Sequence, residues 1–337
     1  MSNINNPFTS AFGLNYPIIM APMFLVSNEN MVKEAIRCGI MGTFPTLNYR
    51  KNEELEKVLK NLQEFKEANP QFKGSYGVNI IVQKSNPKVE SHLKLCVKYK
   101  VPFYITSLGN PKQVIEQAKT YGAKVYSDVT NVEHAKKADS VGCDGFIAVG
   151  QGAGGHAGPY PLSVLIPSLK KNFPNKPIIA AGGIAHGSSI LSMLSLGGAG
   201  CSIGTRFIAS TEATVSDDYK NAIVEYDMKD IVLTDKISGT PCTIINTPYA
   251  KKVGYKQNWF ERLLSNNSTT KKYFKMLVQL RGMKKFEQAL KPGTYKTLWC
   301  AGQSVELIDE IKSTEEIINQ LVFEMDAGKQ TLDLQFV

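Results

Sequence analysis

The first 206 residues of the chain alternate between short apolar runs and longer amphipathic stretches. Each run holds four to seven residues, most of them apolar or β-branched, and a turn follows it. Continuous apolar runs of this length are typical of strands that are buried on both faces. The eight runs lie at 17–20, 41–44, 76–82, 103–106, 124–127, 145–149, 177–180 and 201–204.

The stretches between these runs have the spacing of amphipathic helices. The clearest of them lie at 28–38, 52–66, 87–99, 111–121, 132–141 and 188–196. Strands that alternate with helices form parallel sheets covered by helices. Eight such units within about 200 residues predict an α/β fold of the closed (β/α)8 TIM-barrel type. An open, doubly wound sheet has similar spacing and stays an alternative.

The rhythm changes after Arg206. Polar stretches at 217–228, 259–265 and 271–290 have helical character, and turn residues interrupt them at 239–241 and 292–293. We therefore expect a smaller helical substrate or lid domain over 214–302. Apolar positions spaced along one face of 303–327 predict a helix that returns to the barrel. The barrel domain would then comprise 1–213 and 303–337.

Composition and charge narrow the class of protein. With 337 residues, 43% of them hydrophobic and 20% charged, the chain is typical of globular proteins. No apolar run approaches the ~20 residues that span a bilayer, and the N-terminus lacks a secretory pattern, so we expect a cytoplasmic protein without a membrane partner. The net charge of +9 comes from dispersed lysines without a nucleic-acid-binding motif, which argues against nucleic acid as a partner. The oligomeric state stays open, a homodimer included.

Cysteine and histidine usage points to one candidate catalytic residue and no metal. The six cysteines are scattered without metal-ligand spacing, so we expect reduced thiols. His156 stands in the stretch GQGAGGHAGP, residues 150–159, which follows a predicted strand and would lie on the reactive face of a barrel. Its imidazole can exchange protons near neutral pH. We expect His92 and His134 to be solvated helix residues, and His186 to meet solvent or the edge of a cofactor.

Two further turns predict a phosphate site. The segments 181–185 and 203–206 follow the seventh and eighth runs, where barrels commonly bind phosphate through backbone N–H groups. The segment 20–23, Met-Ala-Pro-Met, follows the first run and offers an apolar surface to a flat ligand. Asn79 lies inside the third run, where a buried amide needs a hydrogen-bonding partner. Tight turns and core packing are the alternative interpretations.

The motifs PIIMAPM, YGVNI, AGGHAG, IIAAGGIA, GAGCSIGTRF and WCAGQ together resemble the nitronate monooxygenase family of FMN-dependent (β/α)8 barrels. The resemblance runs from about residue 15 to the C-terminal helix and is loosest over 214–299. It implies an active-site role for His156. It also implies that the flavin packs on Met20, Ala21 and Pro22, that Asn79 hydrogen-bonds it, and that Gly154 lies beside it. The FMN phosphate would be held by Gly183, Ser202, Ile203, Gly204 and Thr205.

Three positions depart from the family pattern: Val149 and Gly152 stand where many relatives carry Gln or Glu, and His186 replaces a common Asp. These departures concern the fine flavin contacts and the subclass within the family. The resemblance implies oxidation of an alkyl nitronate or nitroalkane by FMN and O2, giving a carbonyl compound and nitrite. Alternatives are an NAD(P)H-dependent flavin reductase acting on quinones or enoyl-ACP, an IMP-dehydrogenase-like barrel, and a flavin-binding module without turnover.

Overall fold

Eight parallel strands form a closed barrel in this computed structural model, which describes residues 4–235, 241–256 and 298–336. Strand β1 pairs with β9, with Ile19 opposite Ser202, and this pairing closes the barrel and excludes the open sheet. Each strand overlaps one predicted apolar run. The strands are β1 (Ile18–Met20), β2 (Met41–Pro45), β3 (Ser75–Ile81), β4 (Phe103–Ser107), β5 (Lys124–Val129), β6 (Gly145–Val149), β8 (Ile178–Ala181) and β9 (Gly200–Ile203).

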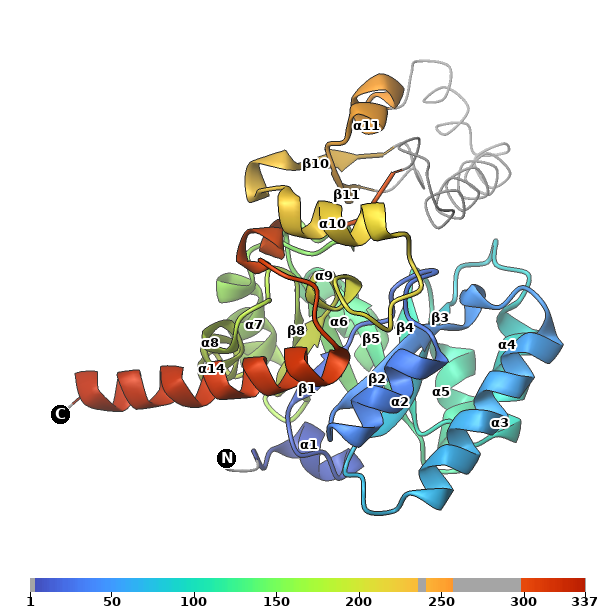
Figure 1. Cartoon of the computed structure of the whole chain (residues 1–337). Coiled ribbons are helices and arrows are strands. Elements are labelled where there is room, and N and C mark those ends of the chain that lie inside the picture. The colour runs from blue at the N-terminus through green and yellow to red at the C-terminus, as the bar shows by residue number, and fades with distance from the viewer. Residues whose placement is uncertain (1–3, 236–240, 257–297, 337) are drawn as a thin grey trace.

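Helices surround the barrel (Figure 1), and the six predicted ones are confirmed within a few residues at either end. The ring also contains α7 (Leu162–Asn172), which lies outside the predicted stretches and has Pro167 in its interior. Among the described residues no helix is both long and apolar enough to cross a membrane. The six predicted helices are α2 (Glu29–Arg37), α3 (Asn52–Ala68), α4 (Val89–Lys98), α5 (Lys112–Lys119), α6 (Val132–Asp139) and α8 (Gly187–Ser195).

The amino-terminal end of the barrel is filled by aromatic side chains. Helix α1 (Pro7–Phe12) lies across this end, and Figure 1 shows it at the bottom of the barrel. Phe8 and Phe12 of α1 pack edge-on against Phe103 of β4, at ring-centroid distances of 6.2 and 5.1 Å. Phe103 in turn packs edge-on against Tyr126 of β5. Because this end is plugged, the opposite end of the barrel is the one that can accept a ligand.

A second layer covers the carboxyl ends of the strands, above the barrel in Figure 1. It contains α10 (Asp217–Glu225), β10 (Ile231–Thr234), β11 (Cys242–Ile245) and α11 (Pro248–Val253). The strands β10 and β11 form an antiparallel sheet with β7 (Gly155–His156). This sheet differs from the purely helical character expected for 214–302.

The boundaries expected for that layer stay a prediction. The predicted helices at 259–265 and 271–290 lie outside the described residues. Trp299, placed by sequence in the lid, is 2% exposed and stacks on Tyr219 of α10 at 5.4 Å between ring centroids. The chain therefore returns from this layer through a buried segment.

The C-terminal helix α14 (Thr314–Gln335) begins later than the predicted 303–327. Residues Gln303–Leu307 form a 3-10 turn instead, and Ser313 starts the helix through a capping box with Glu316. The pattern Ser-x-x-Glu at 313–316 was the signal for this start. Helix α14 packs on α8 so closely that a Cβ on Gly187 would lie 2.2 Å from the Met325 nitrogen.

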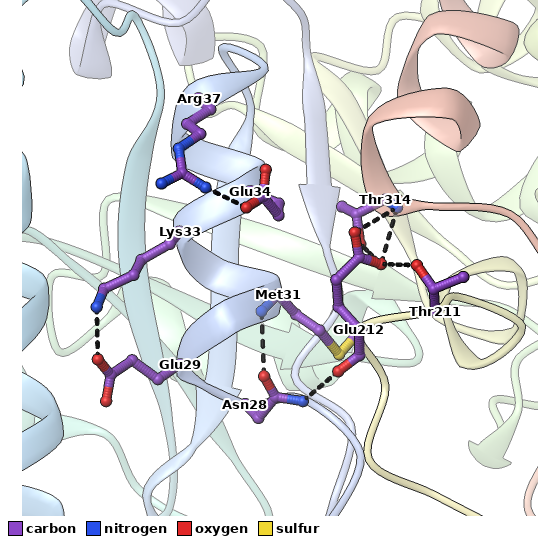
Figure 2. A network of polar contacts seen from close by, with 9 residues as sticks. All are labelled: Asn28, Glu29, Met31, Lys33, Glu34, Arg37, Thr211, Glu212 and Thr314. Carbon is purple, nitrogen blue, oxygen red and sulfur yellow. Dashed lines mark hydrogen bonds and ion pairs between the residues drawn. The ribbon is translucent and has the colours of Figure 1, made fainter.

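Glu212 joins three parts of the chain around the start of α14 (Figure 2). Its carboxylate accepts hydrogen bonds from the Thr314 backbone N–H at 2.9 Å and from the hydroxyls of Thr314 and Thr211. Its carbonyl accepts from Asn28 Nδ2 at 2.8 Å, and Asn28 Oδ1 caps α2 by accepting from the Met31 N–H. The N-termini of α2 and α14 are thus fixed to the segment that follows β9.

His92 is buried, which corrects the expectation that it is solvated. It is 1% exposed in α4, and burial lowers its pKa to about 4, so the ring is neutral at pH 7. Neither ring nitrogen has a hydrogen-bond partner within the described structure. The burial of His92 could have been inferred from the sequence, because positions 89, 92, 93 and 96 lie on one face of a helix. The charged residues between them made this face hard to recognise. His134 is exposed, as expected.

Candidate active site

A cavity of about 1370 Å³ opens at the carboxyl ends of the barrel strands. Its volume exceeds the roughly 300–1,000 Å³ of an ordinary ligand pocket, so a cofactor and a substrate can share it. Met20 and Ile203 do not line it, since both are buried inside their strands at 0% and 1% exposure. The other predicted site residues all do: Ala21, Pro22, Asn79, Gly154, His156, Gly183, Ser202, Gly204 and Thr205.

The turn after β1 forms a fixed apolar surface of the cavity. The Ala21 N–H donates to the Ile203 carbonyl at 2.9 Å, which ties this turn to the end of β9. The Ser27 hydroxyl donates to the Ala21 carbonyl and accepts from the Met23 N–H. Met20 and Ile203 therefore act on the cavity only through the backbone that they hold in place. At this turn the apolar surface of the cavity is formed by Ala21 and Pro22.

Polar side chains at the ends of β3, β4 and β5 form a hydrogen-bonded row along the cavity. Asn79 Nδ2 donates to the Ser107 hydroxyl at 2.7 Å and to the Ile105 carbonyl at 3.2 Å. Ser107 donates onward to Asp128 Oδ2 at 2.5 Å. Burial raises the pKa of Asp128 to about 6, against the opposing effect of the Ser107 hydrogen bond.

Sequence reasoning missed Asp128. The predicted run ended at residue 127, one position before it, although an acidic residue at the carboxyl end of a barrel strand is a recognisable signal. A carboxyl group with a pKa near 6 exchanges protons close to neutral pH. Asp128 lines the same cavity as His156.

Asp128→Asn is expected to stabilise the protein at pH 8. In the folded chain the pKa of Asp128 is raised to about 6 from 3.8, so ionising it costs stability as the pH rises through this window. Asparagine can still accept the Ser107 hydrogen bond without a charge. We expect the free energy of unfolding to increase by about 1–3 kcal/mol at pH 8 and by roughly half as much at pH 5. Chemical denaturation at both pH values measures this, and an unchanged or pH-independent stability would contradict it.

His156 occupies the two-residue strand β7, which pairs with β11 so that His156 lies opposite Cys242. The Thr243 hydroxyl on β11 donates to the Ala153 and Gly155 carbonyls, which fixes the loop that leads to the histidine. His156 is exposed to the cavity, yet the surrounding protein lowers its pKa by desolvation. The imidazole is therefore neutral at pH 7 and able to accept a proton.

The glycines around His156 bring backbone segments together. A Cβ on Gly158 would lie 2.0 Å from the Val149 carbonyl oxygen, one on Gly182 2.6 Å from the Ala153 nitrogen, and one on Gly154 2.8 Å from the Gly302 nitrogen. The sequence suggested that they allow close approach to a cofactor. The structure shows that they allow three loops to touch, while Gly152 and Gly154 also line the cavity.

The end of β9 and the turn that follows it offer donors suited to a phosphate. Ser202 and Thr205 bring hydroxyls, and Gly204 begins the short helix α9 (Thr205–Ile208) without a side-chain cap. The Thr205 hydroxyl accepts from the Gly302 N–H at 3.0 Å and can still donate its own proton. The Gly183 N–H, by contrast, donates to the Gly152 carbonyl at 2.9 Å. Hydroxyl and backbone donors beside a helix start fit a phosphate group.

His186 lies outside the cavity lining and has a structural role. Its backbone is the N-cap of α8, and its Nδ1 accepts from the Ser188 N–H at 3.1 Å. Its Nε2 lies 3.6 Å from Glu324 of α14, and the side chain is 44% exposed to solvent. The departure from the family's Asp therefore leaves a capping residue in place. Val149 and Gly152, the other two departures, do line the cavity.

The chain matches one protein family and is similar in sequence to several known proteins. The nitronate monooxygenase family model matches residues 44–324. The chain is 25% identical to the (3aS,4S,5R,7aS)-5-hydroxy-7a-methyl-1-oxo-octahydro-1H-indene-4-carboxyl-CoA dehydrogenase of Rhodococcus jostii, over 96% of each chain. It is 28% identical to a probable nitronate monooxygenase of Staphylococcus saprophyticus, over 73% of this chain and 79% of the relative.

Solved structures show the same architecture. FabK from Thermotoga maritima superposes with a TM-score of 0.83 at 27% identity, covering 99% of this chain and all of FabK. Nitroalkane oxidase from Streptomyces ansochromogenes gives a TM-score of 0.77 at 19% identity, covering 97% of this chain and 100% of that one. The second likeness concerns the fold alone.

Proposed function

The chain belongs to the nitronate monooxygenase family, and on that premise we propose that it uses FMN and O2 to oxidise alkyl nitronates to a carbonyl compound and nitrite. The enzyme is an oxidoreductase acting on a small molecule. One observation carries the proposal: His156 lines the same cavity as the strand ends that the family resemblance assigns to the flavin.

The donor set of the cavity supports the placement of FMN. The phosphate would be held by Ser202, Gly204 and Thr205, where hydroxyls and a helix start lie together. The ring would pack on Ala21 and Pro22. Asn79 donates through Nδ2 to the barrel, so its carbonyl oxygen would accept from the ring. Gly183 would leave room for the phosphate but would not donate a hydrogen bond to it, because its N–H already binds the Gly152 carbonyl.

The chemistry of the protein centres on His156. FMN, when bound, supplies the electron acceptor. A nitronate is already a carbanion equivalent, so the protein has only to hold its oxygens and exclude competing proton transfers. The neutral imidazole of His156 can donate its N–H to a nitronate oxygen, or accept the α-proton of a nitroalkane at its other nitrogen.

A second candidate is flavin chemistry on an acyl thioester. Two observations favour it: the Rhodococcus jostii dehydrogenase, whose substrate name contains a CoA ester, aligns over 96% of this chain, and the cavity of about 1370 Å³ is larger than an ordinary ligand pocket. An NAD(P)H-dependent reductase acting on enoyl-ACP or quinones belongs to the same group.

Anaerobic stopped-flow mixing separates these functions. We expect propionate 3-nitronate or propyl-2-nitronate to bleach the flavin absorbance within the turnover time, and nitrite to accumulate in air. Rapid bleaching by NADH or NADPH with no response to nitronate would overturn the proposal in favour of the reductase. Bleaching by neither class, together with no response to acyl thioesters, would indicate a flavin-binding module without turnover.

A further inference from the structure

Two cysteine thiols meet in the wall of the cavity. The Sγ atoms of Cys242 and Cys300 are 3.5 Å apart, although the residues are 58 positions apart in the sequence. Both residues line the cavity. Cys242 is 2% exposed and Cys300 is half-buried, so a small molecule in the cavity can reach the pair through Cys300.

The backbone holds both cysteines in position. Cys242 belongs to β11, and Cys300 forms an antiparallel bridge with Ile244 of the same strand. The Tyr219 hydroxyl donates to the Cys300 carbonyl at 2.5 Å, and the Ile245 N–H donates to the Trp299 carbonyl at 2.8 Å. A disulfide requires a sulfur–sulfur distance of about 2.0 Å, so closing this pair needs a side-chain movement of about 1.5 Å.

We propose that Cys242 and Cys300 are a peroxide-sensitive dithiol site that closes to a disulfide beside the active-site histidine. In the first step hydrogen peroxide oxidises the Cys300 thiol to a sulfenic acid and is reduced to water. In the second step the Cys242 thiol attacks the sulfenic sulfur, the S–S bond forms, and the hydroxyl leaves with the thiol proton as a second water. Dithiothreitol reverses the reaction.

The environment of the two thiols determines the expected rate of their oxidation by peroxide. The hydrogen bond to Cys242 and burial raise the pKa of Cys300. Because the thiolate is the reactive form, oxidation is slower than at an exposed thiol of low pKa. The pair therefore responds to hydrogen peroxide that persists rather than to a brief pulse. An O2-consuming oxidoreductase can meet such peroxide in its own cavity.

Disulfide formation is expected to affect catalysis because Cys242 lies opposite His156 in the β7–β11 pairing. Closing the disulfide moves the Cys242 side chain toward Cys300, and we expect the strain of this movement to shift the paired strand β7, which carries the imidazole. A displacement of about 1 Å at a catalytic group costs up to about 10²-fold in rate. Oxidation is thus expected to lower turnover reversibly.

The chemical part of the proposal is tested without flavin or substrate. Purified apoprotein is treated with hydrogen peroxide, alkylated with a maleimide, and mapped by peptide mass spectrometry. We expect a Cys242–Cys300 linkage, a mass loss of two hydrogens, and a higher Tm, since a cross-link between distant residues restrains the unfolded chain. Cys38→Ser, which removes a half-buried thiol elsewhere, is expected to behave like wild type, and Cys242→Ser and Cys300→Ser to form no linkage. Oxidation of Cys38 without the 242–300 linkage would overturn the proposal.

The regulatory part is tested on the FMN-loaded enzyme with whichever substrate reduces the flavin. Each protein is compared with its own untreated sample. Peroxide is expected to lower wild-type turnover and dithiothreitol to restore it, whereas Cys300→Ser shows no dithiothreitol-reversible loss. A linkage that forms and leaves turnover unchanged would refute the effect on His156. Because the linkage is assayed in apoprotein, its outcome is independent of which substrate the enzyme uses.

Discussion

Replacing His156 with asparagine is expected to lower kcat with a nitroalkane by about 10²–10⁴-fold and to leave FMN bound, since general base catalysis is lost and the flavin surface is not. His156 lines the cavity from β7 and lies opposite Cys242 in the strand pairing, and it is not among the residues proposed to hold the phosphate. Asparagine keeps a hydrogen-bond donor and cannot accept the α-proton. With a preformed nitronate, which needs no deprotonation, the loss is expected to be smaller.

The pH profile of the same variant separates a catalytic from a structural role. Desolvation lowers the pKa of His156, so wild-type kcat with a nitroalkane is expected to rise with pH through a step below 6.5 and then to level off. The asparagine variant should lack that step. His186→Asn is the matched control, because His186 caps α8 outside the cavity and asparagine is itself a good N-cap. Equal kcat values for wild type and His156→Asn would remove His156 from the mechanism.

Gly204→Ala is expected to weaken FMN binding by about 10–100-fold, the equivalent of roughly 1–3 kcal/mol of overpacking, without destabilising the apoprotein. A Cβ on Gly204 would meet protein atoms only at ordinary contact, with Ala21 Cβ nearest at 3.6 Å. The residue has a φ of −108°, which alanine adopts. The new methyl group would therefore occupy space assigned to the phosphate.

Gly158 is the matched control for Gly204, because a side chain there would meet protein atoms instead of the cavity. A Cβ on Gly158 would lie 2.0 Å from the Val149 carbonyl, so Gly158→Ala should lower the Tm of the apoprotein itself. Isothermal titration with FMN and with riboflavin measures the first effect, and calorimetry measures the second. Gly204→Ala with wild-type affinity for FMN would place the phosphate elsewhere.

The barrel was predictable because its buried strands have continuous apolar sequences. Each of the eight runs became a strand, since a strand covered on both faces needs no polar alternation. The β7–β11 sheet was not predictable, because β7 contains two residues and lies inside a glycine-rich loop. Its partner β11 is four residues long and follows a turn-rich stretch.

The candidate site was predictable where the signal is local in sequence. His156 and the turns after β1, β8 and β9 each stand directly after an apolar run, and the barrel geometry brings them to one cavity. Asp128 and the Cys242–Cys300 pair were missed for different reasons. Asp128 lay just beyond a predicted strand end, and the two cysteines meet only because β11 and residue 300 pair in the folded chain.

We propose that the carboxyl end of this barrel binds a phosphorylated flavin beneath His156. The most direct measurement is titration of purified apoprotein with riboflavin 5′-phosphate, followed by flavin absorbance and fluorescence, with unphosphorylated riboflavin in parallel. We expect saturable binding of FMN at one site per chain, much tighter than that of riboflavin. A colourless protein that leaves the FMN spectrum unchanged would contradict it.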